Sequence, residues 1–358
     1  MLYQADWPLA KDHYKQWWNH EGFVLWLTAD LTVPREPISQ PPPSTSPEQA
    51  WFDIPHRISW SEYRLACTEF LADSFPQAET QLGPGSLATF LGAEPKVDWN
   101  TVWYQPCIED PDSFGPVHFD PQNNHWLDVH LAVVKEAIQR SHGRWLVGIP
   151  DLIENMDTLA ALRGDGPLFF DLIERPGWVY ERLGEINETF FQVYDIFYEL
   201  VKDTQGGSIF NPFNIWGPGK TAKVQCDISA SLSPKMFRKF VAPHLDAQCK
   251  WLDFSLYHLD GTTCLQHLDI LLEIDSIDGI EWTPQDQSQP TGGSSHWYDL
   301  YHRIKSSGKS VQVIGVQDDE LIPLLDAIGP EGTYVMMNGG RNLDQAEKLI
   351  KAVEPYRK

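Results

Sequence analysis

The stretch "DFSLYHLDG", residues 253–261, is an apolar run that ends in a histidine, an aspartate and a glycine. Such a run is typical of a buried strand in a parallel sheet. Amphipathic stretches of helical length separate most of the similar runs, which is the pattern of strands and crossover helices. An α/β fold, a single (β/α)8 TIM barrel over residues 1–358, is therefore predicted from eight runs: 24–31, 144–152, 208–216, 222–229, 253–261, 279–284, 310–316 and 333–340.

Two regions depart from this regular pattern. Only "GPGKT" separates run 208–216 from run 222–229, which is too short for a helical crossover and leaves open that one of the two is an insertion. Residues 33–130 are rich in proline, tryptophan and aspartate, with a proline cluster at 33–50. We expect them to form a loop-rich elaboration near the barrel mouth rather than a separate domain. Ser233, before Pro234, and Asn342 are expected helix N-caps.

Composition narrows the class of partner. A formal net charge of −23 disfavours nucleic acid and anionic membranes as partners, and leaves a small neutral or cationic molecule as the expected ligand. No apolar run is long enough to span a bilayer and no secretory signal is visible, so a cytoplasmic location is expected. The five cysteines are odd in number and without a C-x-x-C pair, which argues against disulfides and a thiolate zinc cluster. Fifteen tryptophans favour an aromatic-lined pocket.

Polar residues at the ends of the predicted strands are the candidates for chemistry, because these ends share one mouth in a parallel barrel. His258 and Asp260 are two apart on a strand and share a face, where an imidazole beside a carboxylate can bind a metal or move a proton. The candidate catalytic residues are His258, Asp260, Asp227 and Glu281, and the candidate metal ligands are His258, Asp260 and Cys226. The candidate substrate-binding residues are Asp151, Trp216, Trp282 and Asn338. A structural role as helix caps is the alternative for Asp151 and Asp227, whereas Cys264 is expected to be a small buried apolar group.

Several segments resemble the uroporphyrinogen decarboxylase superfamily over about residues 140–358. They are "GRWLVGIPDLIENMDTLAALRGDGPLFFDLIERPGWV" (143–179), "DISASLSPKMFRKFVAPHL" (227–245), "YHLDG" (257–261) and "LLEIDSIDGIEWTP" (271–284). The resemblance implies one (β/α)8 barrel with the active cleft at its carboxyl mouth. It also implies either a cofactor-free decarboxylase or a zinc-dependent methyltransferase that works with a corrinoid protein or a thiol acceptor.

The chain departs from that superfamily at two places. Arg35 is the one arginine in its first 56 residues, where porphyrinogen decarboxylases carry an arginine-rich motif, so a polyanionic porphyrinogen is not the expected substrate. The zinc methyltransferases have His-x-Cys where this chain has His258-Leu259-Asp260. A zinc site would here use His258 and Asp260, with Glu281 or Cys226.

The favoured hypothesis is a methyltransferase of a small methylated substrate, related to corrinoid-dependent methyltransferases. Zinc is its candidate cofactor and a corrinoid protein its candidate partner. His258 and Asp260 would act as acid/base groups or hold the metal, Asp227 or Glu281 would orient them, and Trp216 and Trp282 would form an aromatic cage. The alternatives are a metal-independent decarboxylase of a non-porphyrin acid, in which a protonated carboxyl or His258 protonates the carbanion, and a barrel that binds a sugar or cation without turnover.

Overall fold

A computed structural model describes residues 2–284 and 288–357 as a mixed α/β fold with a mainly parallel sheet. The strands are β1 (Phe23–Asp30), β2 (Thr68–Ala72), β3 (Gln77–Ala78), β4 (Glu94–Val97), β5 (Val102–Gln105), β6 (Leu146–Val147), β7 (Ser208–Phe210), β8 (Ile215–Gly217), β9 (Thr221–Gln225), β10 (Phe254–Asp260), β11 (Gly279–Thr283), β12 (Ser310–Val316) and β13 (Thr333–Met337).

Helices occupy much of the remaining chain. The α-helices are α1 (Trp7–Trp18), α2 (Pro47–Phe52), α3 (Ile54–Ala66), α4 (Leu87–Phe90), α5 (Pro111–Phe114), α6 (His125–Ser141), α7 (Asn155–Arg163), α8 (Asp165–Glu174), α9 (Pro176–Val201), α10 (Pro234–Met236), α11 (Ala242–Trp251), α12 (Leu268–Glu273), α13 (Tyr298–Ser306), α14 (Leu321–Ile328) and α15 (Leu343–Val353). The shorter helical turns are η1 (Pro212–Asn214), η2 (Asp227–Ser231), η3 (Phe237–Val241), η4 (Thr262–His267), η5 (Ser295–Trp297) and η6 (Glu354–Arg357). No helix in the described ranges is long and apolar enough to cross a bilayer.

The main sheet has the strand order β2-β1-β13-β12-β11-β10-β9. All neighbours are parallel except β2, which pairs antiparallel with β1 at one edge. The predicted strands at 24–31, 222–229, 253–261, 279–284, 310–316 and 333–340 are confirmed as members of this sheet, although the second ends at Gln225 and the last at Met337. Parallel neighbours require a crossover, and helices α11 to α14 provide one between each successive pair from β9 to β13.

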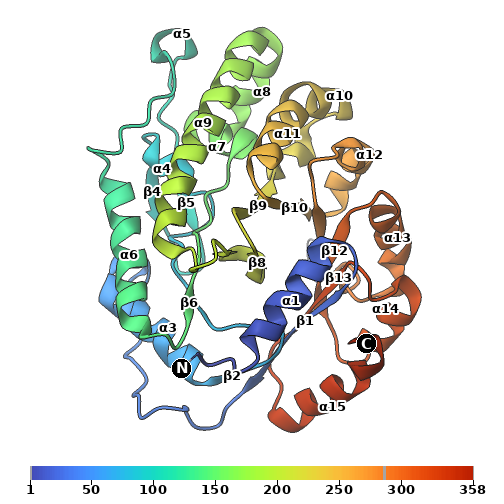
Figure 1. The fold of residues 1–358 in the computed structure, drawn as a ribbon. Coiled ribbons are helices and arrows are strands. Elements are labelled where there is room, and N and C mark those ends of the chain that lie inside the picture. Colours follow the sequence, from blue (N-terminus) through green and yellow to red (C-terminus); the bar gives the residue numbers. More distant parts are fainter. Residues whose placement is uncertain (1, 285–287, 358) are drawn as a thin grey trace.

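The crossover helices lie outside the strands, with α12 to α15 along the periphery in Figure 1. Helix α14 illustrates the cause, because its buried residues Leu321, Leu324, Leu325 and Ile328 follow the i, i+3, i+4, i+7 spacing of one helical face. The two predicted N-caps are confirmed: the Ser233 hydroxyl accepts from the Met236 N–H, and Asn342 forms a capping box with Gln345.

The predicted strand at 208–216 is wrong in its middle. Strands β7 and β8 form an antiparallel hairpin, and the turn between them places Phe213 at φ 63° and Asn214 at φ 51°, a left-handed conformation that interrupts any strand. Polar side chains hold the turn: Gln312 Nε2 donates to Phe213 O at 2.7 Å and the Tyr334 hydroxyl donates to Asn214 O at 2.9 Å. Because β8 runs back along β7, the chain needs no helical crossover before β9, and the short stretch "GPGKT" is long enough to connect the two predicted runs.

The predicted strand at 144–152 is also shorter than expected. Leu146 and Val147 pair with β3, Ile149 makes one parallel bridge to Phe210, and Pro150 offers no N–H for a ladder. Main-chain ladders between the described strands therefore do not close into a continuous barrel. Across the gap, the Ser208 hydroxyl donates to Gly219 O at 2.6 Å and accepts from the Thr221 N–H at 3.3 Å, so β7 lies beside β9 without pairing to it.

Helix α1 covers the amino ends of the parallel strands. Trp17 donates its indole N–H to Val311 O at 3.3 Å, and the Trp18 ring lies 5.2 Å from the ring of Phe254, the first residue of β10. Both tryptophans are buried. Side chains of α1 therefore fill the space at the amino ends of β10 and β12.

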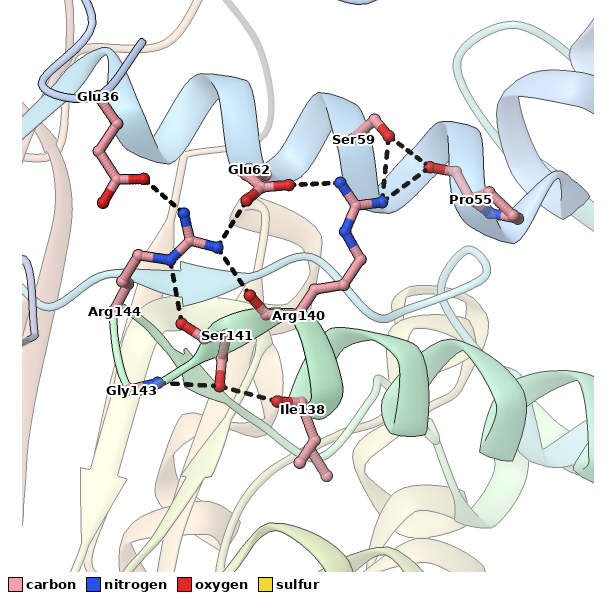
Figure 2. A network of polar contacts seen from close by, with 9 residues as sticks. All are labelled: Glu36, Pro55, Ser59, Glu62, Ile138, Arg140, Ser141, Gly143 and Arg144. Atoms are coloured by element: carbon pink, nitrogen blue, oxygen red, sulfur yellow. Dashed lines mark hydrogen bonds and ion pairs between the residues drawn. The ribbon is translucent and has the colours of Figure 1, made fainter. Parts of the chain in front are cut away.

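Residues 33–130 contain more regular structure than expected, since they include the 13-residue helix α3 and the sheet strand β2. Figure 2 shows how α3 is tied to α6: both carboxylate oxygens of Glu62 are used, one by Arg140 and one by Arg144 at 2.6 Å. Arg144 also pairs with Glu36 at 2.5 Å. Glu62 thus joins α3 to the end of α6, and Arg144 extends the network to the segment that carries Glu36.

Because of this network, we expect Glu62→Gln to destabilise the folded protein. The amide keeps one acceptor oxygen but turns its NH2 group toward an arginine. We expect a loss of about 1–2 kcal/mol in the free energy of unfolding, since the group is mostly but not fully shielded from solvent. Urea denaturation measures it. The matched control is Glu273→Gln, whose partner Arg238 is exposed, and it should change stability little. Equal effects of the two variants would contradict this assignment.

Candidate active site

The parallel register places a row of polar side chains across the sheet. Gln225, His258, Glu281 and Gln312 are partners on the neighbouring strands β9, β10, β11 and β12. Residues paired in a parallel ladder face the same side, so these four share one face of the sheet. The next residues up that face are Asp260 on β10 and Thr283 on β11, which end their strands. The site thus lies at the carboxyl ends.

His258 and Glu281 form a hydrogen-bonded pair through Nδ1 and Oε2. Glu281 is fully buried, and its other oxygen accepts from the Thr283 hydroxyl at 2.7 Å. Burial by itself lowers the pKa of His258, but the charge and hydrogen bond of Glu281 outweigh it and leave the pKa raised. Below the ring, Phe213 lies with its centroid 4.6 Å from that of His258. The imidazole is held in one orientation, with Nε2 left for another partner.

Asp227, His258 and Asp260 bring one potential ligand atom each to within 4.8 Å of one another. His258 and Asp260 are half-buried, whereas Asp227 reaches solvent. Gln225 Nε2 donates to Asp227 Oδ2 at 2.7 Å. Desolvation by the surrounding walls, followed by the charge of Asp157, raises the pKa of Asp227 to about 7. Two carboxylates and an imidazole in this arrangement can hold a divalent metal or move a proton.

Asp157 fixes the turn that carries Asp227. Its two oxygens accept from the N–H groups of Asp227 at 2.8 Å and Ile228 at 2.9 Å, which caps η2. The chain that leads to Asp157 is strained, because Ile153 and Asn155 both have positive φ. Left-handed conformations at non-glycine residues cost about 1–3 kcal/mol each and persist where the surroundings impose them. The same conformation at Phe213 puts strained backbone on two sides of the site.

A buried charge network lies beneath the cluster. The Lys223 ammonium is 2.9 Å from Asp151 Oδ1 and also donates to Gln225 Oε1. Glu154 Oε1 accepts from the Gln225 N–H at 2.9 Å. Burial raises the pKa of Glu154 to about 8, although Lys223 opposes the shift. Asp151 therefore pairs with Lys223 inside the protein.

A cavity of about 610 Å³ opens beside the cluster, and Asp227 and Gln225 form part of its wall. Trp103 and Tyr104 on β5 and Phe169 on α8 also line it. The segment 33–130 thus contributes aromatic side chains to a cavity at the carboxyl ends of the strands.

The structure does not bring four of the expected site residues to this cluster. Trp216 packs against Trp7 of α1, at a ring distance of 5.9 Å, near the amino ends. Trp282 faces the opposite side of β11 from Glu281, with its ring 4.8 Å from that of Trp297. Asn338 is exposed and donates to Gly315 O at 3.2 Å. Cys226 is buried and stands between Gln225 and Asp227 in the sequence.

Several residues of the site were not expected from the sequence: Glu154, Asp157, Phe213, Lys223, Gln225 and Gln312. The alternation in "AKVQCDIS" carried a usable signal, because Lys223, Gln225 and Asp227 are polar and two apart in an apolar strand. Glu154 and Asp157 are three apart at the start of a helix, which places them on one face. Phe213 carried no such signal, since it depends on the turn between β7 and β8.

Comparison with known proteins gives a likeness of fold. No family model matches the sequence, and no curated protein matches it. Among solved structures, a methyltransferase from Methanosarcina mazei is similar at a TM-score of 0.62 and 11% sequence identity, over 98% of this chain and 99% of that one. The two chains therefore share an overall fold along nearly their whole length.

Glu154 predicts a pH dependence of stability. Its pKa is about 8 in the folded protein and ordinarily 4.5, so the folded state holds a proton that the unfolded state releases between these pH values. The contribution to stability is full below pH 4.5 and is lost as pH rises toward 8. Glu154→Gln should therefore gain stability relative to the wild type as pH increases from 5 to 8, measured by urea denaturation at each pH. The exposed substitution Glu347→Gln is the control, and a parallel response of both variants would refute the assignment.

Proposed function

We propose that the chain is a methyltransferase that acts on a small methylated molecule, with Asp227, His258 and Asp260 at its active site. The observation that supports this most is the convergence of these three side chains within 4.8 Å at the carboxyl ends of parallel strands. The fold that the chain shares with a methyltransferase over 98% of its length adds support. Fold likeness alone would not specify a reaction.

The proposal includes a single-domain barrel. Strands β6 and β7 would complete a (β/α)8 arrangement between β9 and the edge of the sheet, with side-chain hydrogen bonds replacing ladders there. In support, one hydrophobic cluster runs from Tyr3 to Val353 and includes buried residues of the segment 33–130, such as Ile58, Leu87 and Ile108.

Zinc is the metal we propose for the cluster, and the donor atoms fit it. Zn²⁺ accepts imidazole nitrogen and carboxylate oxygen, and a ligating histidine ordinarily gives its other ring nitrogen to a carboxylate. His258 meets that pattern, since Nδ1 is bonded to Glu281 and Nε2 is left for the ion. Asp227 and Asp260 would supply oxygen ligands, whereas Cys226 is buried and outside the group of converging side chains. When bound, the ion would supply a Lewis acid at the end of the cavity.

The protein's own residues would position the reactants and handle protons. In methyl transfer the acceptor's electron pair forms the new bond to carbon, and the leaving atom keeps the pair of the bond that breaks. We propose a thiolate or a reduced corrinoid, carried by a partner protein, as the acceptor. Glu281, which also accepts from the Thr283 hydroxyl, holds the His258 ring, and the aromatic wall of the cavity would exclude water from the methyl group.

A metal-independent decarboxylase is the second candidate, favoured by the pKa of about 7 at Asp227, which suits a proton donor near neutral pH. The cavity disfavours it, since no lysine, arginine or histidine is among its lining residues within 2–284 and 288–357 to hold an acid substrate. Binding of a sugar or cation without turnover is the third. Metal content separates the first candidate from the second, and turnover of a methyl donor separates it from the third.

Zinc binding tests the cluster directly. Protein purified without chelator or affinity-tag metal should contain about one zinc per chain. His258→Ala and Asp260→Asn should each lower zinc affinity, measured by titration calorimetry. The loss should exceed the roughly 10- to 100-fold that is typical when a residue hydrogen-bonded to a metal ligand is removed. Cys226→Ala is the control and should bind zinc normally. Loss of zinc in the cysteine variant alone would move the site to a different set of ligands.

Glu281 is expected to act as a positioning residue through His258. Glu281→Gln retains an acceptor but removes the charge, so the pKa of His258 should fall and zinc affinity should drop about 10- to 100-fold. NMR titration of the His258 ring reports the first effect, which a general loss of packing would not produce. Glu320→Gln, whose carboxylate bonds Thr291, should leave both quantities unchanged. An unaltered His258 pKa in Glu281→Gln would refute the role.

A further inference from the structure

The charge of the cavity beside the cluster points to one class of ligand. Its wall contains three carboxylates, Asp157, Asp165 and Asp227. No lysine, arginine or histidine lines it within the described parts of the chain. The molecule's overall charge does not by itself explain this, because a second cavity of about 580 Å³ is lined by His56, Arg57 and Arg64.

The aromatic side chains of the cavity wall also favour a cationic ligand. Trp103 is 55% exposed on β5, and Tyr104 and Phe169 line the same cavity. The Tyr104 hydroxyl donates to Pro84 O, and burial raises its pKa well above the ordinary value, so this side chain offers a neutral ring. Aromatic faces attract cations through the negative potential of the ring face, with tryptophan the strongest.

The hydrogen-bonding groups of the wall are largely occupied. Both oxygens of Asp157 accept main-chain N–H groups, and the Thr158 hydroxyl donates to Ile153 O at 2.7 Å. The amide of Gln225 contacts Lys223 through its oxygen and Asp227 through its nitrogen. The neutral polar groups of this wall are thus already paired, and the exposed carboxylate of Asp165 and the ring faces are left to meet a ligand, which suits a cation without N–H groups.

We propose that this cavity binds a small quaternary ammonium ion. The inference rests on the proposed function, for which it names the substrate class, but it concerns binding and can be tested without turnover. In such an ion the positive charge of the methylated nitrogen is spread over the methyl surface. The aromatic rings would contact these methyl groups, and the carboxylates would balance the charge.

The test uses choline and its neutral carbon analogue, 3,3-dimethylbutan-1-ol, with binding followed by titration calorimetry and ligand-observed NMR on the full chain. Choline should bind, and the neutral analogue should bind about five- to tenfold more weakly or not measurably. Trp103→Ala should weaken choline binding about five- to tenfold, and Trp103→Phe, which keeps a ring, by less.

Trp99→Ala is the matched control, because Trp99 is 53% exposed and lines the arginine-containing cavity instead. It should leave choline binding unchanged. Equal affinity for choline and the neutral analogue would show an apolar cavity only and overturn the proposal. The proposal would also be overturned if choline did not bind, or if choline binding were lost in Trp99→Ala alone. If choline fails to bind while His258→Ala still loses zinc, the cation proposal falls and the proposed function stands. If choline binds and zinc does not, the cation proposal stands and the proposed zinc-dependent function falls.

Discussion

The ion pair between Lys223 and Asp151 joins two parts of the chain that main-chain ladders leave unconnected. Lys223 lies on β9, the last strand of the main sheet, and Asp151 follows β6. Both side chains are buried, and their charged atoms are 2.9 Å apart. A buried charge is tolerated only when it is paired, so this contact constrains the distance between the two parts. Through Gln225, the same ammonium is linked to Asp227, and the position of a candidate ligand thereby depends on a charge pair beneath it.

The interior of the sheet is more polar than stability alone would favour. Glu154, Glu281, Lys223 and Gln312 are almost fully buried, and burying each has a desolvation cost that its partners offset in part. Glu154 has one oxygen without a partner in the described structure. Strained backbone at Phe213 and Ile153 lies close to the same groups. Conflicts between local preference and fold that collect in one place are the expected mark of a functional site.

Much of the site could be predicted from periodicity, and the rest could not. The approach of His258, Asp260 and Asp227 follows from alternation on strands and from parallel neighbours that end at one edge. The same alternation places Trp282 on the opposite face from Glu281 and Cys226 on the opposite face from Gln225, so the sequence could also have indicated that these two side chains lie outside the cluster. Trp216 was different, because its position depends on the β7–β8 hairpin, which is set by contacts from distant residues such as Gln312 and Tyr334. A single sequence does not encode such contacts in any local pattern.

Asp227 belongs both to the ligand cluster and to the cavity wall, and its two oxygens have different surroundings. Oδ2 accepts from Gln225, which leaves Oδ1 to face a metal or a bound cation, but not both at once. If the proposed divalent ion were held by Asp227 and Asp260, it would neutralise the charges of these two carboxylates. Asp165 would then supply the negative charge of the cavity, because both oxygens of Asp157 are taken by main-chain N–H groups. A metal at the cluster and a cation in the cavity are therefore electrostatically compatible, because they draw on different carboxylates.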